Sequence, residues 1–489
     1  MTRTFKKEKT EKMSVRYFEG LNWWILAVVV VANIFFQLSE VSSSLFLYAG
    51  TFVLIGMLFF VDKDDYIYLT VALLSVLRYS QIFNVSVINI ITFAYFFKTY
   101  VFENRYKKEK EKQQFPRNLV IAGTVFILFS LIYIISSIKT TLTVVKLLFF
   151  LVYMVDVFRN MKSKEEAEKK FMSIQVYYVA GVLIAIFVSL VFNPSFSRDA
   201  ARMSLSDGAV NQLGISLASC LAFVTLGMTK VTNIKEWSIL AITALPLLYF
   251  CFETQSRTSI IGLIFVFVSV VILGVIQKKS RPWIILMVIA SVVVLGGLIL
   301  FTEGTQFHSS IMETIERFEN PKNDDISGGR FDLWNIYISR FKNDFKLFLI
   351  GGNLQDYGGR QAHNMFLETI TSFGIIGTSV FVWLYSVTFN EIRLAISAFG
   401  KRKIRLLGFV PFLLIFLMGM ASHSLQNTEP TVNFCLGVAM IYLYGEDDFK
   451  NENYVDNGDD TAFESFSKRK RVKNIRRLDY RYGKKIRRF

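Results

Sequence analysis

Residues 303–364 read EGTQFHSSIMETIERFENPKNDDISGGRFDLWNIYISRFKNDFKLFLIGGNLQDYGGRQAHN, and the rest of the chain is organised around this stretch. It is the longest polar interval between hydrophobic runs. Those runs are mostly about 17–25 residues long, which is the length an α-helix needs to cross a bilayer. The pattern predicts an all-α, polytopic membrane helix bundle of about 12–14 spans. The polar stretch would form a long external loop that carries short amphipathic helices.

Composition supports the membrane assignment. The 489-residue chain is 53% hydrophobic and 19% charged, with a mean hydropathy of +0.40, whereas soluble chains carry about a quarter charged residues. A transmembrane β-barrel would show alternating segments of about ten residues, and these runs do not alternate. No small-residue cleavage site follows the first run, which starts at Asn22, so we expect a retained span and not a signal peptide.

Fourteen spans are expected in all. They cover about 22–38, 42–61, 66–83, 85–102, 118–138, 141–158, 173–192, 213–228, 237–252, 260–276, 283–301, 370–389, 406–421 and 432–444. A re-entrant pair in place of the second and third would leave twelve and keep every loop on the same side.

The spans divide the chain into five predicted parts. These are a cytoplasmic basic N-terminus (1–21), eleven transmembrane helices (22–302), an external catalytic loop (303–369), three further transmembrane helices (370–444) and a cytoplasmic basic tail (445–489).

The net charge of +16 is explained by topology and does not require a nucleic-acid partner. All strongly basic connections fall on one side of the predicted spans, and basic loops orient membrane proteins with that side in the cytoplasm. Both termini are therefore expected to be cytoplasmic. The polybasic tail suits anionic membrane lipid; a regulatory or partner-docking role is the alternative.

Cysteine and carboxylate patterns give no sign of a metal or cofactor. Cys220, Cys251 and Cys435 lie in or beside apolar runs without metal-ligand spacing, so they are expected to be ordinary core residues.

Three external residues are the candidates for chemistry. Arg257 lies where two spans meet on the outside, and a cation at that depth suggests a function. Arg330 follows a Ser-Gly-Gly turn and opens a predicted amphipathic helix, whose apolar residues Phe331, Trp334, Ile338 and Phe341 recur at helical spacing. His363 opens the next helix. The alternatives are an interfacial arginine, a capping or surface arginine and a structural histidine.

Together these residues fit a phosphate-dependent transfer. Arginine guanidinium groups match phosphate oxygens and neutralise a diphosphate leaving group. A histidine titrates near neutral pH and can accept a proton from a sugar hydroxyl.

At these positions the sequence resembles the O-antigen ligase and polysaccharide polymerase superfamily (Wzy/WaaL type). His363-Asn364, nine residues and then Gly374-Ile375-Ile376-Gly377 match the pattern HN-x9-GxxG. Ser256-Arg257, the string from Gly329-Arg330 to Trp334 and the turn Leu349–Asn353 are also similar to that family.

The resemblance implies a metal-independent, multi-span glycosyltransferase on the outer face of the bacterial plasma membrane. Its donor and acceptor would be glycans on undecaprenyl diphosphate. Arg257 and Arg330 would hold the donor diphosphate, and His363 would activate the acceptor hydroxyl. Asn364 belongs to the same motif and is a candidate for substrate binding.

Further candidates for glycan or phosphate contact lie outside those motifs. They are Arg198, Arg202, Asp332 and Arg360.

A polymerase of repeat units for a capsule or similar surface polysaccharide is the leading expectation. The high content of Phe, Ile, Lys and Asn favours an AT-rich genome and a Gram-positive host, in which no lipid A acceptor exists. A chain-length regulator and a flippase are possible partners of a polymerase. The alternatives are a ligase that transfers glycan to a lipid A core, and a lipid-linked glycan flippase. A flippase predicts two similar halves, which the sequence does not show.

Overall fold

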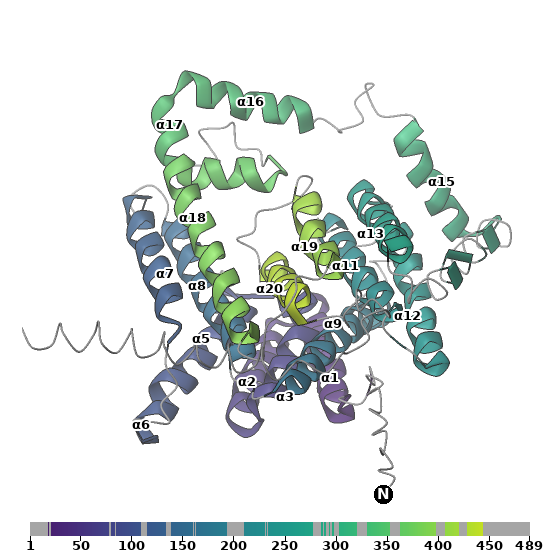
Figure 1. Cartoon of the computed structure of the whole chain (residues 1–489), viewed down its shortest axis with the longest axis horizontal. Helices are drawn as coiled ribbons and strands as arrows, with labels where there is room; N and C mark the ends of the chain where they lie inside the picture. Colours follow the sequence, from purple (N-terminus) through teal and green to yellow (C-terminus); the bar gives the residue numbers. More distant parts are fainter. Residues whose placement is uncertain are drawn as a thin grey trace, which may run out of the picture. The chain divides into compact units, whose positions relative to one another are not determined.

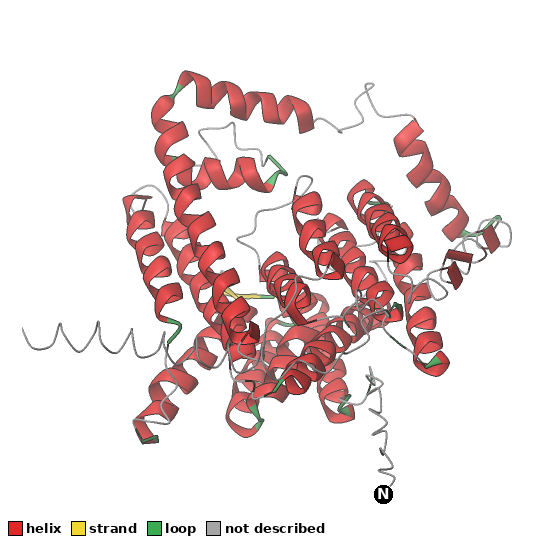
Figure 2. Cartoon of the chain, in the orientation of Figure 1, coloured by secondary structure: helices red, strands yellow, loops and turns green. Residues whose placement is uncertain are grey.

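The computed structural model of the protein describes most of the chain between Phe18 and Leu443. The described residues are 18, 21–77, 80–83, 85–108, 115–133, 138–159, 161, 163–192, 210–229, 231, 233–276, 285–286, 288–289, 293, 296–297, 303–319, 330–352, 362–397, 406–419 and 428–443. Figure 2 shows helices throughout this part of the chain, apart from one two-stranded hairpin. The predicted all-α class is confirmed.

The elements are labelled in Figure 1. The first half contains α1 (Trp23–Val41), α2 (Ser44–Phe60), α3 (Lys63–Ala72), α4 (Leu74–Leu77), β1 (Gln81–Ile82), β2 (Val85–Ser86), α5 (Val87–Phe96), the π-helix η1 (Phe97–Glu103), α6 (Asn104–Tyr106), α7 (Arg117–Ser130), the 3-10 turn η3 (Leu131–Tyr133), α8 (Ile138–Arg159) and α9 (Lys164–Phe192). The second half contains α11 (Val210–Met228), α12 (Ile234–Glu253), α13 (Arg257–Ile276), α15 (Gln306–Glu319), α16 (Arg330–Asn343), α17 (Phe345–Ile350), α18 (Met365–Ser397), α19 (Leu406–Gly419) and α20 (Thr428–Leu443).

Several of these helices suit a bilayer. Among the described residues, α1, α9, α12 and α18 are long and apolar enough to cross a membrane, judged by length and composition, and α2, α7, α11, α13, α19 and α20 are shorter apolar helices. Large apolar side chains also face outward, for example Leu45 (73% exposed), Phe52 (76%) and Ile242 (65%). Such surface is costly in water but matches hydrocarbon. The protein is therefore a multi-pass membrane protein.

One predicted span is wrong as a single helix. The segment expected to cross at about 66–83 breaks after α3 and again after α4, and the hairpin β1–β2 follows, with Gln81 opposite Ser86 and Ile82 opposite Val85. The physical reason lies in the polar sequence RYSQ after Leu77, because polar and charged groups are costly on a lipid-facing helix.

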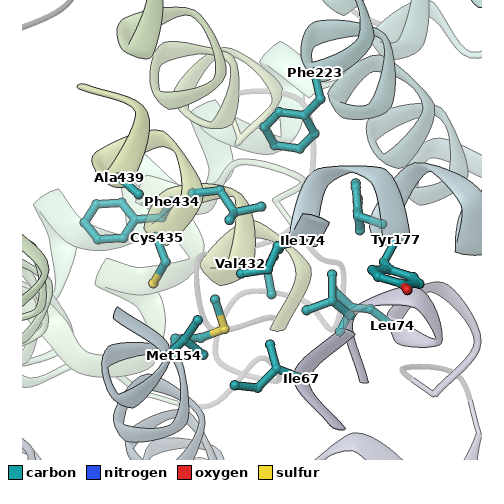
Figure 3. Packing of buried hydrophobic residues seen from close by; sticks show 14 of the residues in the cluster. Ile67, Leu74, Met154, Ile174, Tyr177, Phe223, Val432, Phe434, Cys435 and Ala439 are labelled. Carbon is teal, nitrogen blue, oxygen red and sulfur yellow. The ribbon is translucent and has the colours of Figure 1, made fainter. Parts of the chain in front are cut away.

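The core joins the two halves of the sequence. Figure 3 shows side chains from α3, α4, α8, α9, α11 and α20 packed together, among them Ile67, Leu74, Met154, Ile174, Tyr177, Phe223, Val432, Phe434, Cys435 and Ala439. Glycine permits the closest approach: a Cβ on Gly181 of α9 would lie 1.9 Å from the Ala72 carbonyl oxygen of α3. The three cysteines are buried and form no disulfide, as expected of core residues.

The helix after the loop is bent at a glycine. Gly374 interrupts α18 with φ 62° and ψ −178°, a backbone conformation that favours glycine. The end of α17 packs into the bend, where a Cβ on Gly374 would lie 2.2 Å from the Leu349 carbonyl oxygen. Gly351 has φ 77°, and a Cβ there would lie 2.5 Å from the Gly374 nitrogen. The glycines of both sequence motifs therefore form one backbone-to-backbone contact.

α18 also extends past the predicted span at both ends, beginning at Met365 and ending at Ser397. Its first residues, 365–373, come directly after His363 and before the bend. The bend thus separates a short first segment, which begins beside His363, from the long helix that suits the bilayer.

Candidate functional site

His363 lies at the entrance to α18 in an unusual backbone conformation. Its φ is +50°, which is uncommon for any residue except glycine. The Glu368 carboxylate accepts a hydrogen bond from the His363 backbone N–H at 3.0 Å. The Asn364 side-chain oxygen accepts from the backbone N–H groups of Phe366 (3.0 Å) and Leu367 (3.2 Å). Asn364 is therefore the N-cap of the helix, with Glu368 one turn further on.

Arg330 is the first residue of α16, as the sequence predicted. The predicted helix is confirmed, but its buried face is rotated from the expected one. Phe331 and Ile338 are 57% and 41% exposed, whereas Tyr337 is completely buried. The face that packs is formed by Trp334, Tyr337 and Phe341, at helical spacing of three and four residues.

Two aromatic residues of α16 attach it to the segment that carries His363. Tyr337 packs with Ala362 and Leu367. The Trp334 indole N–H donates a hydrogen bond to the Ala362 carbonyl oxygen at 3.0 Å. Figure 1 shows α16 and α17 preceding α18 along the chain. The helix that begins with Arg330 is thus fixed to the residue next to His363.

Arg257 begins α13 after a tight turn from α12. Gln255 in that turn has φ +47°, and Ser256 is fully buried. The Ser256 hydroxyl donates to the Asn211 side-chain oxygen of α11 at 2.8 Å and accepts from the Ser259 backbone N–H at 3.4 Å. Ser256 therefore ties the start of α13 to α11, which explains why a serine precedes Arg257.

Electrostatics link the three predicted residues. Burial lowers the pKa of the Arg330 guanidinium, and the charge of Arg257 lowers it further. Burial also lowers the pKa of His363 below its ordinary value of 6.5, and the charge of Arg330 contributes. Each effect requires proximity, so Arg330 lies within electrostatic range of both Arg257 and His363, which come from separate segments.

This arrangement suits acid–base chemistry beside an anion. With its pKa lowered, the His363 imidazole is neutral at pH 7 and able to accept a proton. Arginine keeps its charge because its pKa lies far above neutrality. Two fixed cations can bind an anionic leaving group, while a neutral base beside them removes a proton from a neutral hydroxyl.

The comparison with protein families adds an independent observation. Residues 240–382 match the family model described as O-antigen ligase.

Over these residues the chain is similar to the O-antigen ligase family, and we call this part the O-antigen ligase domain.

The O-antigen ligase domain runs from α12 into the long part of α18 and contains Arg257, Arg330 and His363. The resemblance stated from the sequence motifs is confirmed. Members of the family are enzymes, ligases and polymerases, that act on lipid-linked glycans. Comparisons with curated proteins and with solved structures return no match.

The remaining predicted substrate contacts stay predictions. Arg198, Arg202 and Arg360 lie outside the described residues. Asp332 is exposed in the first turn of α16. The Asn364 side-chain oxygen, predicted to meet substrate, is engaged in capping α18.

Three residues of the O-antigen ligase domain were missed as parts of the site: Trp334, Tyr337 and Glu368. Trp334 appeared in the sequence only as a family motif and as an apolar helix position. A signal for Glu368 did exist, because an acidic residue one turn after an Asn N-cap is typical of a helix start. Nothing in the sequence indicated that its carboxylate would bind the His363 backbone N–H.

Proposed function

We propose that the protein polymerises undecaprenyl-diphosphate-linked oligosaccharide repeat units into a capsular or O-antigen-like surface polysaccharide. The reaction would take place on the outer face of the bacterial plasma membrane, without a metal. The observation that supports this proposal most is the grouping of Arg257, Arg330 and His363 inside the O-antigen ligase domain.

In the proposed reaction an acceptor hydroxyl attacks the anomeric carbon of the donor glycan. The bond between that carbon and the diphosphate oxygen breaks, and undecaprenyl diphosphate leaves. Arg257 and Arg330 would bind the diphosphate and stabilise the charge that develops on it. The His363 imidazole would accept the proton of the attacking hydroxyl. Asn364, Arg198, Arg202 and Arg360 are proposed as further contacts to substrate.

The topology is part of the proposal. Residues 303–369 would lie outside the cell and both termini in the cytoplasm, where the basic tail would meet anionic lipid. A flippase that delivers the donor and a chain-length regulator are the proposed partners. The family assignment favours an enzyme over the transporter alternative.

A ligase is the second candidate, because the matching family is described as O-antigen ligase. The two reactions differ only in the acceptor. Polymerisation needs lipid-linked repeat units alone, whereas ligation needs a separate acceptor such as a lipid A core.

The test is purified enzyme supplied with lipid-linked repeat units and no other acceptor. A ladder of chain lengths on the lipid carrier is the expected result. We expect His363→Ala and Arg330→Ala to reduce the rate by about 100-fold or more, since a general base contributes about 10² to 10⁴. Arg340→Ala is the matched control, because Arg340 is exposed on the same helix. A ladder of normal length from His363→Ala would refute the site, and product only with an added core acceptor would favour the ligase.

A further inference from the structure

We infer that Glu368 and Trp334 are positioning residues that hold the 362–363 peptide segment from two sides, and so fix the His363 imidazole relative to Arg330. The inference rests on the proposed role of His363. It concerns residues that have no place in that proposed chemistry.

The two hydrogen bonds act on consecutive residues. Trp334 donates to the carbonyl oxygen of Ala362 at 3.0 Å, and Glu368 accepts from the N–H of His363 at 3.0 Å. One contact comes from α16 and the other from α18. Both groups belong to the peptide unit that joins Ala362 to His363, so the two contacts fix the plane of that unit. The capped start of α18 fixes the chain on the other side of His363, and together these contacts set the direction of the His363 Cα–Cβ bond.

The backbone of His363 requires such support. A residue with a side chain at φ +50° is strained and persists only where the surroundings determine it. Asn364 fixes the helix just after it by capping Phe366 and Leu367. Without Glu368, the His363 N–H would lose a charge-assisted hydrogen bond, which is among the stronger kinds.

Tyr337 completes the support. Its side chain is fully buried, and burial together with the negative charge of Glu368 raises the pKa of its hydroxyl to about 12. The Glu368 carboxylate therefore lies near the Tyr337 hydroxyl while it accepts from His363. Because Tyr337 and Trp334 share α16 with Arg330, the same contacts that hold His363 also hold the helix that begins with Arg330.

Glu368→Ala and Glu368→Gln separate positioning from other roles. Glutamine keeps an oxygen that accepts from the His363 N–H, whereas alanine does not. We expect Glu368→Ala to lower kcat about ten- to a hundredfold with little change in the KM for lipid-linked donor. The reason is that displacing a catalytic group by about 1 Å can lower the rate by up to about 10²-fold. Glu368→Gln should recover most of that loss. Trp334→Phe keeps the ring and removes the donor, and it should lower kcat in the same way.

The measurements are kcat, KM and the melting temperature of each purified variant, beside His363→Ala. If His363→Ala is inactive while both Glu368 variants keep the wild-type kcat, the positioning inference is wrong and the proposed function stands. If Glu368→Ala and Glu368→Gln raise the donor KM equally, Glu368 binds substrate and the inference is overturned. If only melting temperature falls, the role is structural and the inference fails. If His363→Ala keeps its activity, both the proposed function and this inference are refuted.

Discussion

At the scale of single residues, the site depends on local backbone conformation as much as on side-chain chemistry. His363 itself has a positive φ, and so does Gln255, two residues before Arg257. The sequence motifs named the three reactive candidates. They did not predict these conformations, because a positive φ at a residue other than glycine is imposed by contacts from distant segments.

The lowered pKa of His363 gives a prediction for pH dependence. The positive charge of Arg330 disfavours the imidazolium, so removing that charge raises the pKa of His363. On the proposed function, activity requires the neutral base and is lost as pH falls through this pKa. We expect the acid limb of kcat/KM for the wild type to lie below the ordinary histidine value of 6.5, and the residual activity of Arg330→Gln to show that limb at higher pH.

The control is Arg340→Gln, which alters an exposed arginine on the same helix. Its acid limb should match that of the wild type. An unchanged limb in Arg330→Gln would mean that His363 does not control the acid limb, or that Arg330 lies too far away to affect it.

At the scale of elements, α16 shows that the spacing of apolar residues predicts a helix but not the face by which the helix packs. The spacing of apolar residues predicted a helix here, and the helix is present. The direction in which it faces depends on what it packs against, and the sequence does not reveal that partner. Tyr337 was not among the apolar residues that predicted the helix, yet it is the residue at the centre of the contact.

Truncation of Tyr337 should detach α16 from the segment around Ala362 that it packs against. We expect Tyr337→Ala to remove about 3 kcal/mol or more of local packing, by analogy with buried aromatic truncations, and to expose α16 to limited proteolysis with loss of activity. Ile338→Ala is the matched control, since the neighbouring side chain is 41% exposed, and it should behave like the wild type. Equal protection of both variants would contradict the packing described for α16.

The bend in α18 gives a second element-scale prediction. Gly374→Ala meets both a positive φ and the Leu349 backbone at 2.2 Å, so the substitution must separate α17 from α18. We expect an overpacking cost of at least about 1–3 kcal/mol, seen as a lower melting temperature in detergent and reduced activity. Gly56→Ala is the control, because a Cβ there has no neighbour within 4 Å. Equal melting temperatures of the two variants would show that the bend is dispensable.

At the scale of the whole molecule, composition and run length predicted the class, because the bilayer permits few structures other than helices. Most expected spans coincide with observed helices. The segment around 66–83 differs because short polar sequences decide between a continuous helix and a break, and run length does not detect them. The meeting of Arg257 with Arg330 was inferred from shared sidedness and from family resemblance. Their proximity depends on tertiary packing, of α13 against α11 and α12 and of α16 against α17 and α18.

Sidedness can be measured with single cysteines. Asn343 of α16 and Lys108 after α6 are exposed and should lie on opposite sides of the membrane. We expect Asn343→Cys to react with an impermeant thiol reagent applied to intact cells, and Lys108→Cys to react only after permeabilisation. The native cysteines are buried, so background labelling should be low. The reverse pattern would invert the topology and exclude an external active site.

The neighbouring charges of Arg257 and Arg330 have a consequence for the order in which the site assembles. Two guanidinium groups at close range repel each other. A diphosphate between them would reverse the sign of that force and act as a shared counter-ion. Trp334 and Tyr337 hold the middle of α16 against Ala362, whereas a bound donor would hold the end of the helix that begins with Arg330. On the proposed function, the lipid-linked substrate is therefore also the last structural component of its own binding site.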